Sequence, residues 1–418
     1  MGITRASFIL FLGNLAGMGG YSLFQVYMSR RLTPAEFGTL NALQALFLVL
    51  AVPANIFAQS LNRHFGQSFA LRKLQTLRTH YFCFARGLIY FSVAGFGVYY
   101  AFSGLIGQFL RIEGAYPLLI TGCSIFSFFF LQLNQGFLQG GHRFASMSLS
   151  LGIQGGFRWL CGVLLVVAGF GLNGALSAQT LAFLVASGVT SVAVFSQFSD
   201  RSVSAEDESQ GRIDLDRFFT ESCPIFFALL AYLMLTNVDM LLVKHYLPPA
   251  EAGMYSSLAV LGRGVLFLSE AVAVGMFSIG VHESAIGVGW FDTYHRAFFL
   301  CLVMYVAVLI PFWLQSEMIV NIIFGENYLV NAPFVIWIAI SMALFGLLRI
   351  PINFNLSRNR TGFIILLYLG VLVEGILITL YHNDIFQILM VMVGVSGTLL
   401  LVSECSILAE QRRWQSNQ

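Results

Sequence analysis

The sequence predicts an all-α integral membrane protein of about twelve transmembrane helices, arranged as two six-helix lobes. Three observations predict this fold: the apolar composition, a regular series of long apolar stretches, and a repeat between the two halves. Of the 418 residues, 57% are hydrophobic and 10% are charged, and the mean hydropathy is +0.79. Soluble domains carry about 25% charged residues. The chain therefore lacks the polar surface that a protein surrounded by water requires.

Apolar stretches long enough to cross a membrane recur along the whole chain. A helix needs about 20 apolar residues to span the hydrocarbon core. The stretches that meet this criterion are approximately 6–29, 38–62, 82–102, 116–140, 147–169, 172–197, 217–243, 254–282, 293–315, 332–356, 361–381 and 385–409. The longest polar interruption contains a run of acidic residues and is typical of a solvated linker. The sequence thus predicts an N-terminal lobe of 1–198, a cytoplasmic linker of 199–216 and a C-terminal lobe of 217–418.

The placement of Lys and Arg predicts the orientation, because cytoplasmic loops are enriched in these residues. With the N-terminus inside, fifteen basic residues fall in cytoplasmic segments and four on the opposite side. We therefore expect both termini in the cytoplasm. The remaining three basic residues, Arg158, Arg263 and Arg349, fall within predicted helices.

The loops after the first and seventh spans carry the same motif. Residues 32–38 are LTPAEFG and residues 247–253 are LPPAEAG, so five of seven residues are identical at an offset of 215. Each copy contains six helices, an even number, so both copies have the same orientation. The sequence therefore predicts a pseudo-two-fold axis along the membrane normal, an arrangement that usually encloses a cavity.

Amide side chains lie along one face of the second span. At 100° per residue, Asn41, Gln44, Asn55, Gln59 and Asn62 fall within an arc of roughly 60°. A single buried amide usually joins two helices, but five on one stripe favour a water-lined surface. The first four are therefore candidate ligand contacts.

Charged residues inside the spans are stronger candidates. An Arg or Asp at mid-bilayer costs about 2.5–3.5 kcal/mol on the insertion scale, so it should face protein or water. Arg263 lies near the middle of the eighth span, and Glu270 follows it by seven residues on the same face. Asp239 lies near the outer end of the seventh span.

Two further arginines lie inside helices. Arg158 is central in the fifth span, and Arg349 lies in the inner third of the tenth. Glu374 is central in the eleventh span, so a structural ion pair between Arg349 and Glu374 is an alternative to a functional role for either residue.

The composition favours no cofactor, no metal ion and no nucleic-acid partner. Each of the six cysteines is isolated within an apolar run and forms no metal-ligand motif. A net charge of +2 gives no indication of nucleic-acid binding.

Several loose motifs extend across the chain: RLTPAEFG at 31–38, TNVD at 236–239, LPPAEAGMY at 247–255, LGR at 261–263 and FGENY at 324–328. In these motifs the chain resembles the polysaccharide-biosynthesis flippases of the multidrug/oligosaccharidyl-lipid/polysaccharide superfamily. The resemblance implies a two-lobed bundle with a central cavity walled largely by the first, second, seventh and eighth helices. It also implies translocation of a polyprenyl-pyrophosphate-linked oligosaccharide across the bacterial inner membrane for surface polysaccharide biosynthesis.

This resemblance gives the candidate residues expected roles. Arg263, Arg158 and Arg349 would bind the pyrophosphate, because guanidinium groups offer planar sets of donors to phosphate. The amides of the second span would bind sugar hydroxyls, and Asp239 and Glu270 would serve in coupling or gating. The expected partners are the lipid-linked oligosaccharide and the bilayer, with a glycan polymerase and glycosyltransferases as further candidates.

Two departures from the superfamily leave an alternative open. The chain lacks the two extra C-terminal helices of the lipid II flippases, and its first six helices contain no buried acidic residue of the kind that drug exporters typically use. The alternative is a cation-coupled multidrug exporter of the same superfamily, which requires an anionic cavity. A membrane glycosyltransferase is disfavoured, because the D-x-D at 214–216 lies in a linker too short for a catalytic fold. We expect no enzymatic activity.

Overall fold

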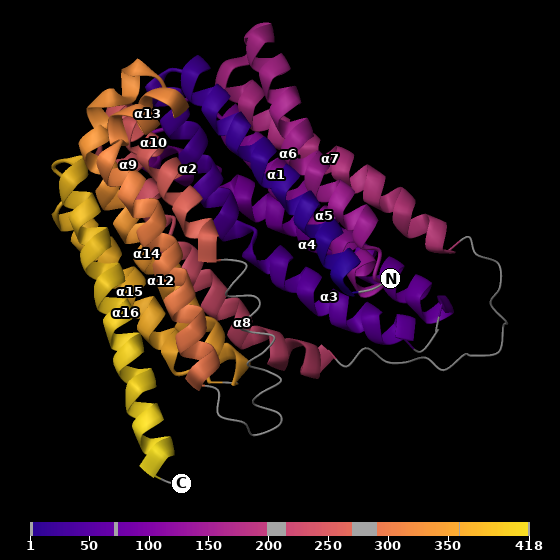
Figure 1. Ribbon diagram of the computed structural model, residues 1–418. Coiled ribbons are helices and arrows are strands. Elements are labelled where there is room, and N and C mark those ends of the chain that lie inside the picture. The colour runs from indigo at the N-terminus through magenta and orange to yellow at the C-terminus, as the bar shows by residue number, and fades with distance from the viewer. Residues whose placement is uncertain (1–2, 71–73, 199–214, 270–290, 359, 417–418) are drawn as a thin grey trace. The chain divides into compact units, whose positions relative to one another are not determined.

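The computed structural model describes residues 3–70, 74–198, 215–269, 291–358 and 360–416, and every regular element in this part of the chain is a helix (Figure 1). Ten helical stretches are long and apolar enough to cross a membrane, and eleven when the bent pair α2–α3 is counted as one span. The longest stretch, Phe144–Phe198, has 55 residues and contains two of the predicted spans. Within it the chain reverses at Gly169 and Gly171, whose φ values of 92° and 49° favour glycine. The protein is therefore a multi-pass membrane protein, as predicted.

The helices form two compact units. Unit 1 consists of Met1–Leu32 and Leu46–Phe226, and unit 2 consists of Thr33–Ala45 and Phe227–Gln418. The segment Thr33–Ala45 thus groups with helices that follow it by two hundred residues. The predicted linker lies outside the described residues, apart from the first two residues of α8.

Unit 1 is built around α5 and the pair α1–α6. Its helices are α1 (Ile3–Arg31), α3 (Val52–Ala70), α4 (Leu74–Phe109), α5 (Tyr116–Gly140), α6 (Phe144–Leu165) and α7 (Gly171–Phe198), with a π-helical turn at Val166–Phe170. The α5 helix packs against α3, α4 and α7. Asn134 of α5 accepts a 2.6 Å hydrogen bond from Tyr81 and donates one of 3.0 Å to Thr190, so it joins α4, α5 and α7.

Glycines bring α1 and α6 into backbone contact. A Cβ atom on Gly155 would collide with the Gly17 carbonyl, and one on Gly20 would collide with Gly155. Small residues permit this close approach where no hydrophobic effect drives helices together, as in lipid. The register of the two helices is therefore set by these three glycines.

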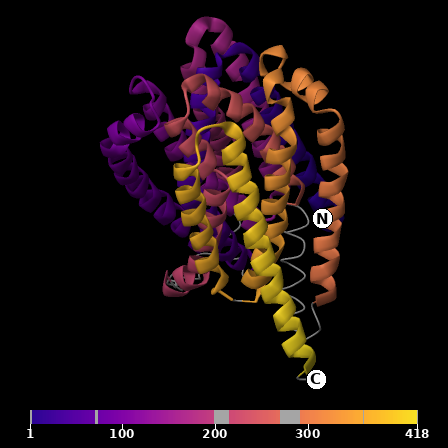
Figure 2. The ribbon, with the colours of Figure 1, turned by 90° about the vertical axis from the view of Figure 1, so that its left-hand side faces the viewer.

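Unit 2 contains the remaining helices. They are the first part of α2 (Pro34–Leu50), the second part of α8 (Leu215–Leu235), α9 (Val238–Tyr246), α10 (Pro249–Leu266), α12 (Phe291–Leu314), α13 (Ser316–Ile323), α14 (Val335–Ser357), α15 (Phe363–Leu380) and α16 (Ile385–Ser416), with 3₁₀ turns at Phe267–Ser269 and Glu326–Phe334. The α14 helix packs against α10, α12 and α16, and α15 packs against α9 and α16. Figure 2 shows α15 and α16 side by side.

Two predicted spans are broken. The second bends by 41° between α2 and α3, next to Pro53, which has no N–H to continue the helical hydrogen bonds. The seventh is interrupted at Thr236 and Asn237, between α8 and α9. The amide stripe predicted along the second span thus runs across a bend, and its role in ligand binding stays a prediction.

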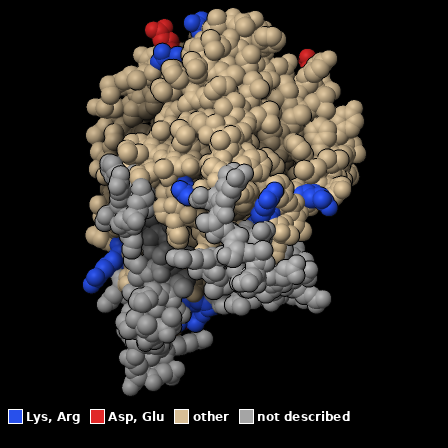
Figure 3. All heavy atoms as spheres, turned by 90° about the vertical axis from the view of Figure 1, so that its right-hand side faces the viewer, with Lys and Arg blue, Asp and Glu red and all other residues tan. Residues whose placement is uncertain are grey.

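The outer surface is largely apolar. The face in Figure 3 carries few charged side chains, and most of it is neither basic nor acidic. Large apolar side chains are exposed on α4, α6 and the π-helical turn, among them Phe91 (57%), Leu164 (61%) and Val167 (70%). Such a surface is suited to lipid rather than water.

Candidate functional site

The break in the seventh span places a carboxyl group inside unit 2. The regular helix stops at Leu235 and resumes at Val238. Side chains bind the carbonyls of the preceding turn, because Thr236 Oγ1 donates to Tyr232 O (3.0 Å) and Asn237 Nδ2 donates to Leu233 O (2.9 Å). Asp239 lies in the first turn of α9 and has no exposed surface. Helices interrupted at membrane depth are typical of substrate and ion sites in transporters.

Tyr255 of α10 holds one oxygen of this carboxyl group. Its hydroxyl donates a 2.6 Å hydrogen bond to Asp239 Oδ2 and lies 3.0 Å from the sulfur of Met392. Asp239 Oδ1 is buried and has no hydrogen-bond partner among the described residues. The carboxyl group is therefore oriented on one side and unpaired on the other.

Arg263 and Glu374 complete a charged cluster with Asp239 and Tyr255. Arg263 on α10 is 6% exposed and interacts electrostatically with Asp239 and Tyr255. Glu374 on α15 has no exposed surface and interacts electrostatically with the same two residues. Within the described part of the chain, neither the three guanidinium nitrogens of Arg263 nor the two carboxyl oxygens of Glu374 have a hydrogen-bond partner.

This arrangement is costly unless something binds to it. Buried charges are normally paired and hydrogen-bonded, because each loses several kcal/mol of hydration. The charged cluster has two carboxyl groups for one guanidinium, and most of their polar atoms make no hydrogen bond. Chemically it offers donors for an anion at Arg263 and acceptors for a proton or cation at Asp239 and Glu374.

Arg349, the third predicted arginine, is engaged elsewhere. Its guanidinium carbon lies 5.4 Å from the ring centroid of Tyr232, whose hydroxyl donates to Phe345 O at 3.2 Å. Because the Glu374 oxygens accept no hydrogen bond from any described residue, the alternative, a structural Arg349–Glu374 ion pair, is not formed. That alternative is therefore excluded, because closeness in sequence does not determine which faces two neighbouring helices turn to each other.

Glu270, the second predicted coupling or gating residue, lies outside the described residues. The regular α10 helix ends at Leu266 and continues as a 3₁₀ turn to Ser269. That Arg263 and Glu270 share one face therefore stays a prediction.

Unit 1 contains a buried guanidinium of its own. Arg158 on α6 is 9% exposed and stacks on two rings of α1, at 5.0 Å from the centroid of Tyr21 and 4.4 Å from that of Phe24. Its Nε and one terminal nitrogen have no hydrogen-bond partner within the described chain. The glycine contacts between α1 and α6 bring the rings and the guanidinium together.

The four predicted amides of the second span fall into both units. Asn41 and Gln44 are buried in unit 2, and Asn41 Nδ2 donates to Phe37 O at 3.1 Å. Asn55 and Gln59 belong to unit 1, where Asn55 accepts a hydrogen bond from Gln132 of α5. Gln59 is exposed.

Tyr255 and Glu374 are the residues that sequence reasoning did not assign to a site. A carboxyl group in the middle of an apolar helix was the available signal for Glu374. The sequence gave no signal for Tyr255, since aromatic residues are common in membrane helices. The contacts join positions 16 and 135 residues from Asp239, so only the fold brings them together.

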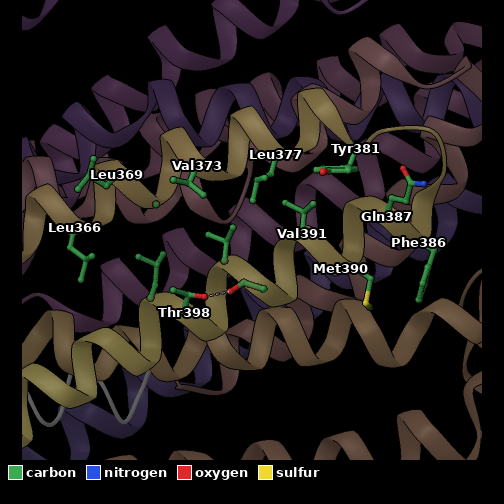
Figure 4. A pocket seen from close by; sticks show the side chains of 14 residues that line it. Leu366, Leu369, Val373, Leu377, Tyr381, Phe386, Gln387, Met390, Val391 and Thr398 are labelled. Carbon is green, nitrogen blue, oxygen red and sulfur yellow. Dashed lines mark hydrogen bonds between the residues drawn. The ribbon is translucent and has the colours of Figure 1, made fainter.

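A second feature of unit 2 is an apolar groove of about 660 Å³ between α15 and α16 (Figure 4). Leu366, Leu369, Val373 and Leu377 line it from α15, and α16 contributes residues such as Met390. Its lining suits hydrocarbon and offers few partners to a charged or sugar headgroup. In the described residues, no three His, Cys, Asp or Glu side chains gather as a metal site.

Comparison with solved structures identifies the fold. A multidrug resistance MATE family transporter of the MOP superfamily, in an inward-facing conformation, is 13% identical over 96% of this chain and 99% of its own, with a TM-score of 0.76. The lipid II flippase MurJ is 13% identical over 97% of this chain and 87% of its own, with a TM-score of 0.68. A eukaryotic MATE transporter is 14% identical over 97% and 96%, with a TM-score of 0.70. The chain thus has the two-lobed fold that these proteins share.

Sequence comparison identifies the family. None of the curated proteins matches the chain. The family model described as "Polysaccharide biosynthesis protein" matches residues 3–278, which is more than half of the sequence. The resemblance drawn from the loop motifs is therefore confirmed, and the chain belongs to the polysaccharide biosynthesis protein family.

Proposed function

We propose that the protein is a flippase that carries a polyprenyl-pyrophosphate-linked oligosaccharide across the bacterial inner membrane for surface polysaccharide biosynthesis. The observation that carries this proposal is Arg263, whose guanidinium is buried among apolar helices and hydrogen-bonded to no described residue. Membership of the polysaccharide biosynthesis family supports it, as does a fold shared with a lipid flippase.

The chemistry of the headgroup fits this guanidinium. A buried donor without a partner costs about 1–3 kcal/mol, so an unpaired buried Arg is expected where a ligand brings the acceptors. Pyrophosphate oxygens match the planar donors of Arg better than those of Lys. Arg158, with free donors of its own in unit 1, is proposed as a second phosphate contact.

The remaining predicted residues have lesser roles in this proposal. Arg349 is stacked on Tyr232 and contributes positive charge rather than free donors. Of the four amides, Gln59 is exposed and available to sugar hydroxyls, whereas Asn41, Gln44 and Asn55 need a rearrangement to reach them.

Asp239 and Glu374 are proposed to couple transport to proton uptake. When pyrophosphate binds at Arg263, its negative charge repels both carboxylates. Protonation of one carboxyl group relieves this repulsion and favours the bound state, and loss of that proton favours release. The proton thereby biases an equilibrium between two states, which is what coupling requires. Glu270 remains a predicted contributor.

A cation-coupled multidrug exporter is the second candidate. The observation in its favour is the excess of carboxyl groups in the charged cluster, which would attract an organic cation in the absence of phosphate. The MATE transporters among the similar structures share the fold. This candidate predicts that loss of Arg263 strengthens transport.

The test replaces Arg263 in the native host and measures surface glycan and membrane protein level in the same cells. Arg263→Ala should abolish glycan export, and Arg263→Lys should keep part of it because the charge survives without the fork geometry. The exposed Arg86→Ala is the control and should export normally. If Arg263→Ala lowers the protein level, adding Glu374→Gln removes the uncompensated charge. A restored level with export absent, where Glu374→Gln alone keeps part of it, still supports the proposal. Normal export from Arg263→Ala at a normal level ends it.

A further inference from the structure

The apolar groove between α15 and α16 lies within unit 2 and takes no part in the mechanism proposed above. It runs along α15 from Leu366 to Tyr381, a length of about 22 Å at 1.5 Å per residue (Figure 4). The two helices close its floor, because a Cβ atom on Gly370 would lie 2.6 Å from Leu399 Cδ1. Val373 on its wall is 47% exposed, so the groove opens on the surface of the unit.

The polar groups of the groove already have partners in the chain. Three of its fourteen lining residues are polar, and two of them, Tyr381 and Gln387, lie where α15 passes to α16. Gln387 Oε1 accepts a 3.3 Å hydrogen bond from the Asn383 N–H, and the Thr398 hydroxyl donates to Gly394 O at 2.7 Å (Figure 4). A hydrocarbon can therefore cover this oxygen and this hydroxyl without leaving either unpaired.

The helices that form the groove also hold the charged cluster. On α15, the floor residue Gly370 is followed one turn later by Glu374, which has no exposed surface. On α16, the lining residue Val395 is preceded one turn earlier by Met392, whose sulfur lies 3.0 Å from the Tyr255 hydroxyl. One helical turn on each side thus separates the groove from the residues around Asp239. A ligand in the groove contacts the same helices that position the charged cluster.

We propose that the groove binds the polyprenyl chain of the transported lipid while its headgroup crosses the membrane. This inference rests on the proposed transport function. The length of the groove favours a polyprenyl chain over the acyl chain of a bilayer lipid. One leaflet of the hydrocarbon core is about 15 Å deep, half of about 30 Å, so an acyl chain covers only part of the groove. A long isoprenoid chain extends along all of it, whichever side of the membrane its headgroup faces.

The width of the groove suits a methyl-branched chain. Gly394 lines the groove and is exposed, and a Cβ atom at this position would have nothing within 4 Å. The missing side chain leaves room for the methyl branches that an isoprenoid carries and a straight acyl chain does not. A side chain introduced at Gly394 would therefore project into the groove and meet the ligand rather than the protein.

A probe that consists of the tail alone tests the groove separately from the headgroup site. The purified full-length protein is placed in phosphatidylcholine vesicles with a polyprenol that carries a diazirine and no phosphate. After irradiation, mass spectrometry measures the probe attached to α15 and α16 relative to that on α4, whose apolar side chains are exposed. Gly394→Leu fills the groove. Gly375→Leu is the matched control, because its Cβ position is equally open but does not line the groove.

The parent and Gly375→Leu should be labelled equally on α15 and α16. Labelling of Gly394→Leu should be at least about tenfold weaker, as expected from the loss of about two buried methylene contacts. Equal labelling of Gly394→Leu and the parent overturns the proposal, as does a diazirine phosphatidylcholine that labels the groove as strongly as the polyprenol. An oligomer that Gly394→Leu dissociates, with no labelling of the groove, assigns the groove to a second copy and also overturns it.

Competition in the parent protein decides if Gly394→Leu fails to insert. An excess of unlabelled polyprenol should suppress the labelling of α15 and α16, and unchanged labelling overturns the proposal. The assay uses no phosphate and measures no export, so the groove can fail while Arg263 variants still lose glycan export. Labelling of the groove together with normal export by Arg263→Ala would instead keep the lipid site and end the proposed function.

Discussion

The hydroxyl of Tyr255 donates a 2.6 Å hydrogen bond to Oδ2 of Asp239, and neither side chain has any exposed surface. The bond joins α10 to the helix that resumes after the break in the seventh span. It leaves the other oxygen of Asp239 without a partner among the described residues. Tyr255 therefore determines which oxygen of Asp239 is available to a proton.

Replacing Tyr255 by Phe should destabilise the protein and weaken export. The change leaves a buried carboxyl oxygen unpaired, which costs about 1–3 kcal/mol. Thermal unfolding in detergent should show the loss as a lower Tm. Tyr328→Phe is the matched control, because the Tyr328 hydroxyl is buried without a partner in the described chain. Equal Tm values for the two variants would contradict the assigned role of the hydrogen bond.

Replacing Glu374 by Gln should lower the turnover of export without lowering the protein level. The substitution keeps the shape and removes one of two carboxylates that share one guanidinium, so the buried charge that remains is balanced. Export by this variant should also respond less to external pH than export by the parent. Glu251→Gln, at an exposed acid on α10, should change neither quantity. A Glu374→Gln protein that keeps the parent's pH response would remove Glu374 from the coupling.

Adding a methyl group at Gly155 should disrupt unit 1, whereas the same change one residue later should not. A Cβ atom at Gly155 collides with the Gly17 backbone, and overpacking of this kind costs about 1–3 kcal/mol. Gly156 has nothing within 4 Å of its Cβ position. The thermal stability of Gly155→Ala and Gly156→Ala, measured side by side, checks the assigned contact between α1 and α6. A Gly155→Ala protein as stable as the parent would show that the helices are not in contact there.

Single cysteines should report the predicted orientation. Labelling from outside should reach Glu36→Cys and Glu251→Cys, which follow the first and seventh spans. Ser209→Cys and Gln415→Cys should be labelled only after the membrane is permeabilised. Finding positions 36 and 251 on opposite sides would contradict both the topology and the parallel repeat.

Most of the fold could be predicted because lipid imposes a length and an apolar character on every span. The breaks at Pro53 and Asn237 could not, since averaging hydropathy over a whole span hides one or two residues that interrupt it. The two breaks matter because one bends the span that carries the amide stripe and the other lies directly before the buried Asp239.

The candidate site was predicted only in part. Arg263, Arg158 and Asp239 could be found because a buried charge is conspicuous in an apolar sequence. The partners of these residues could not be found, because the relative rotation of two packed helices depends on packing over the whole unit. Arg349 illustrates this, since the sequence suggested Glu374 beside it and the fold gives it the ring of Tyr232.

A Cβ atom on Gly38 would lie 2.9 Å from Gly253 N, so the two copies of the loop motif are in backbone contact, and this contact restrains how the chain can evolve. Each copy of the loop motif is part of the other's immediate surroundings, so a side chain gained in one copy collides with the backbone of its counterpart. Copies that never touch are free to diverge in sequence. At the contact, a larger side chain in one copy would be tolerated only with a compensating change in the other. Two rare mutations would then have to arise together. The contact between the two copies thus gives a physical reason for the sequence identity that they share.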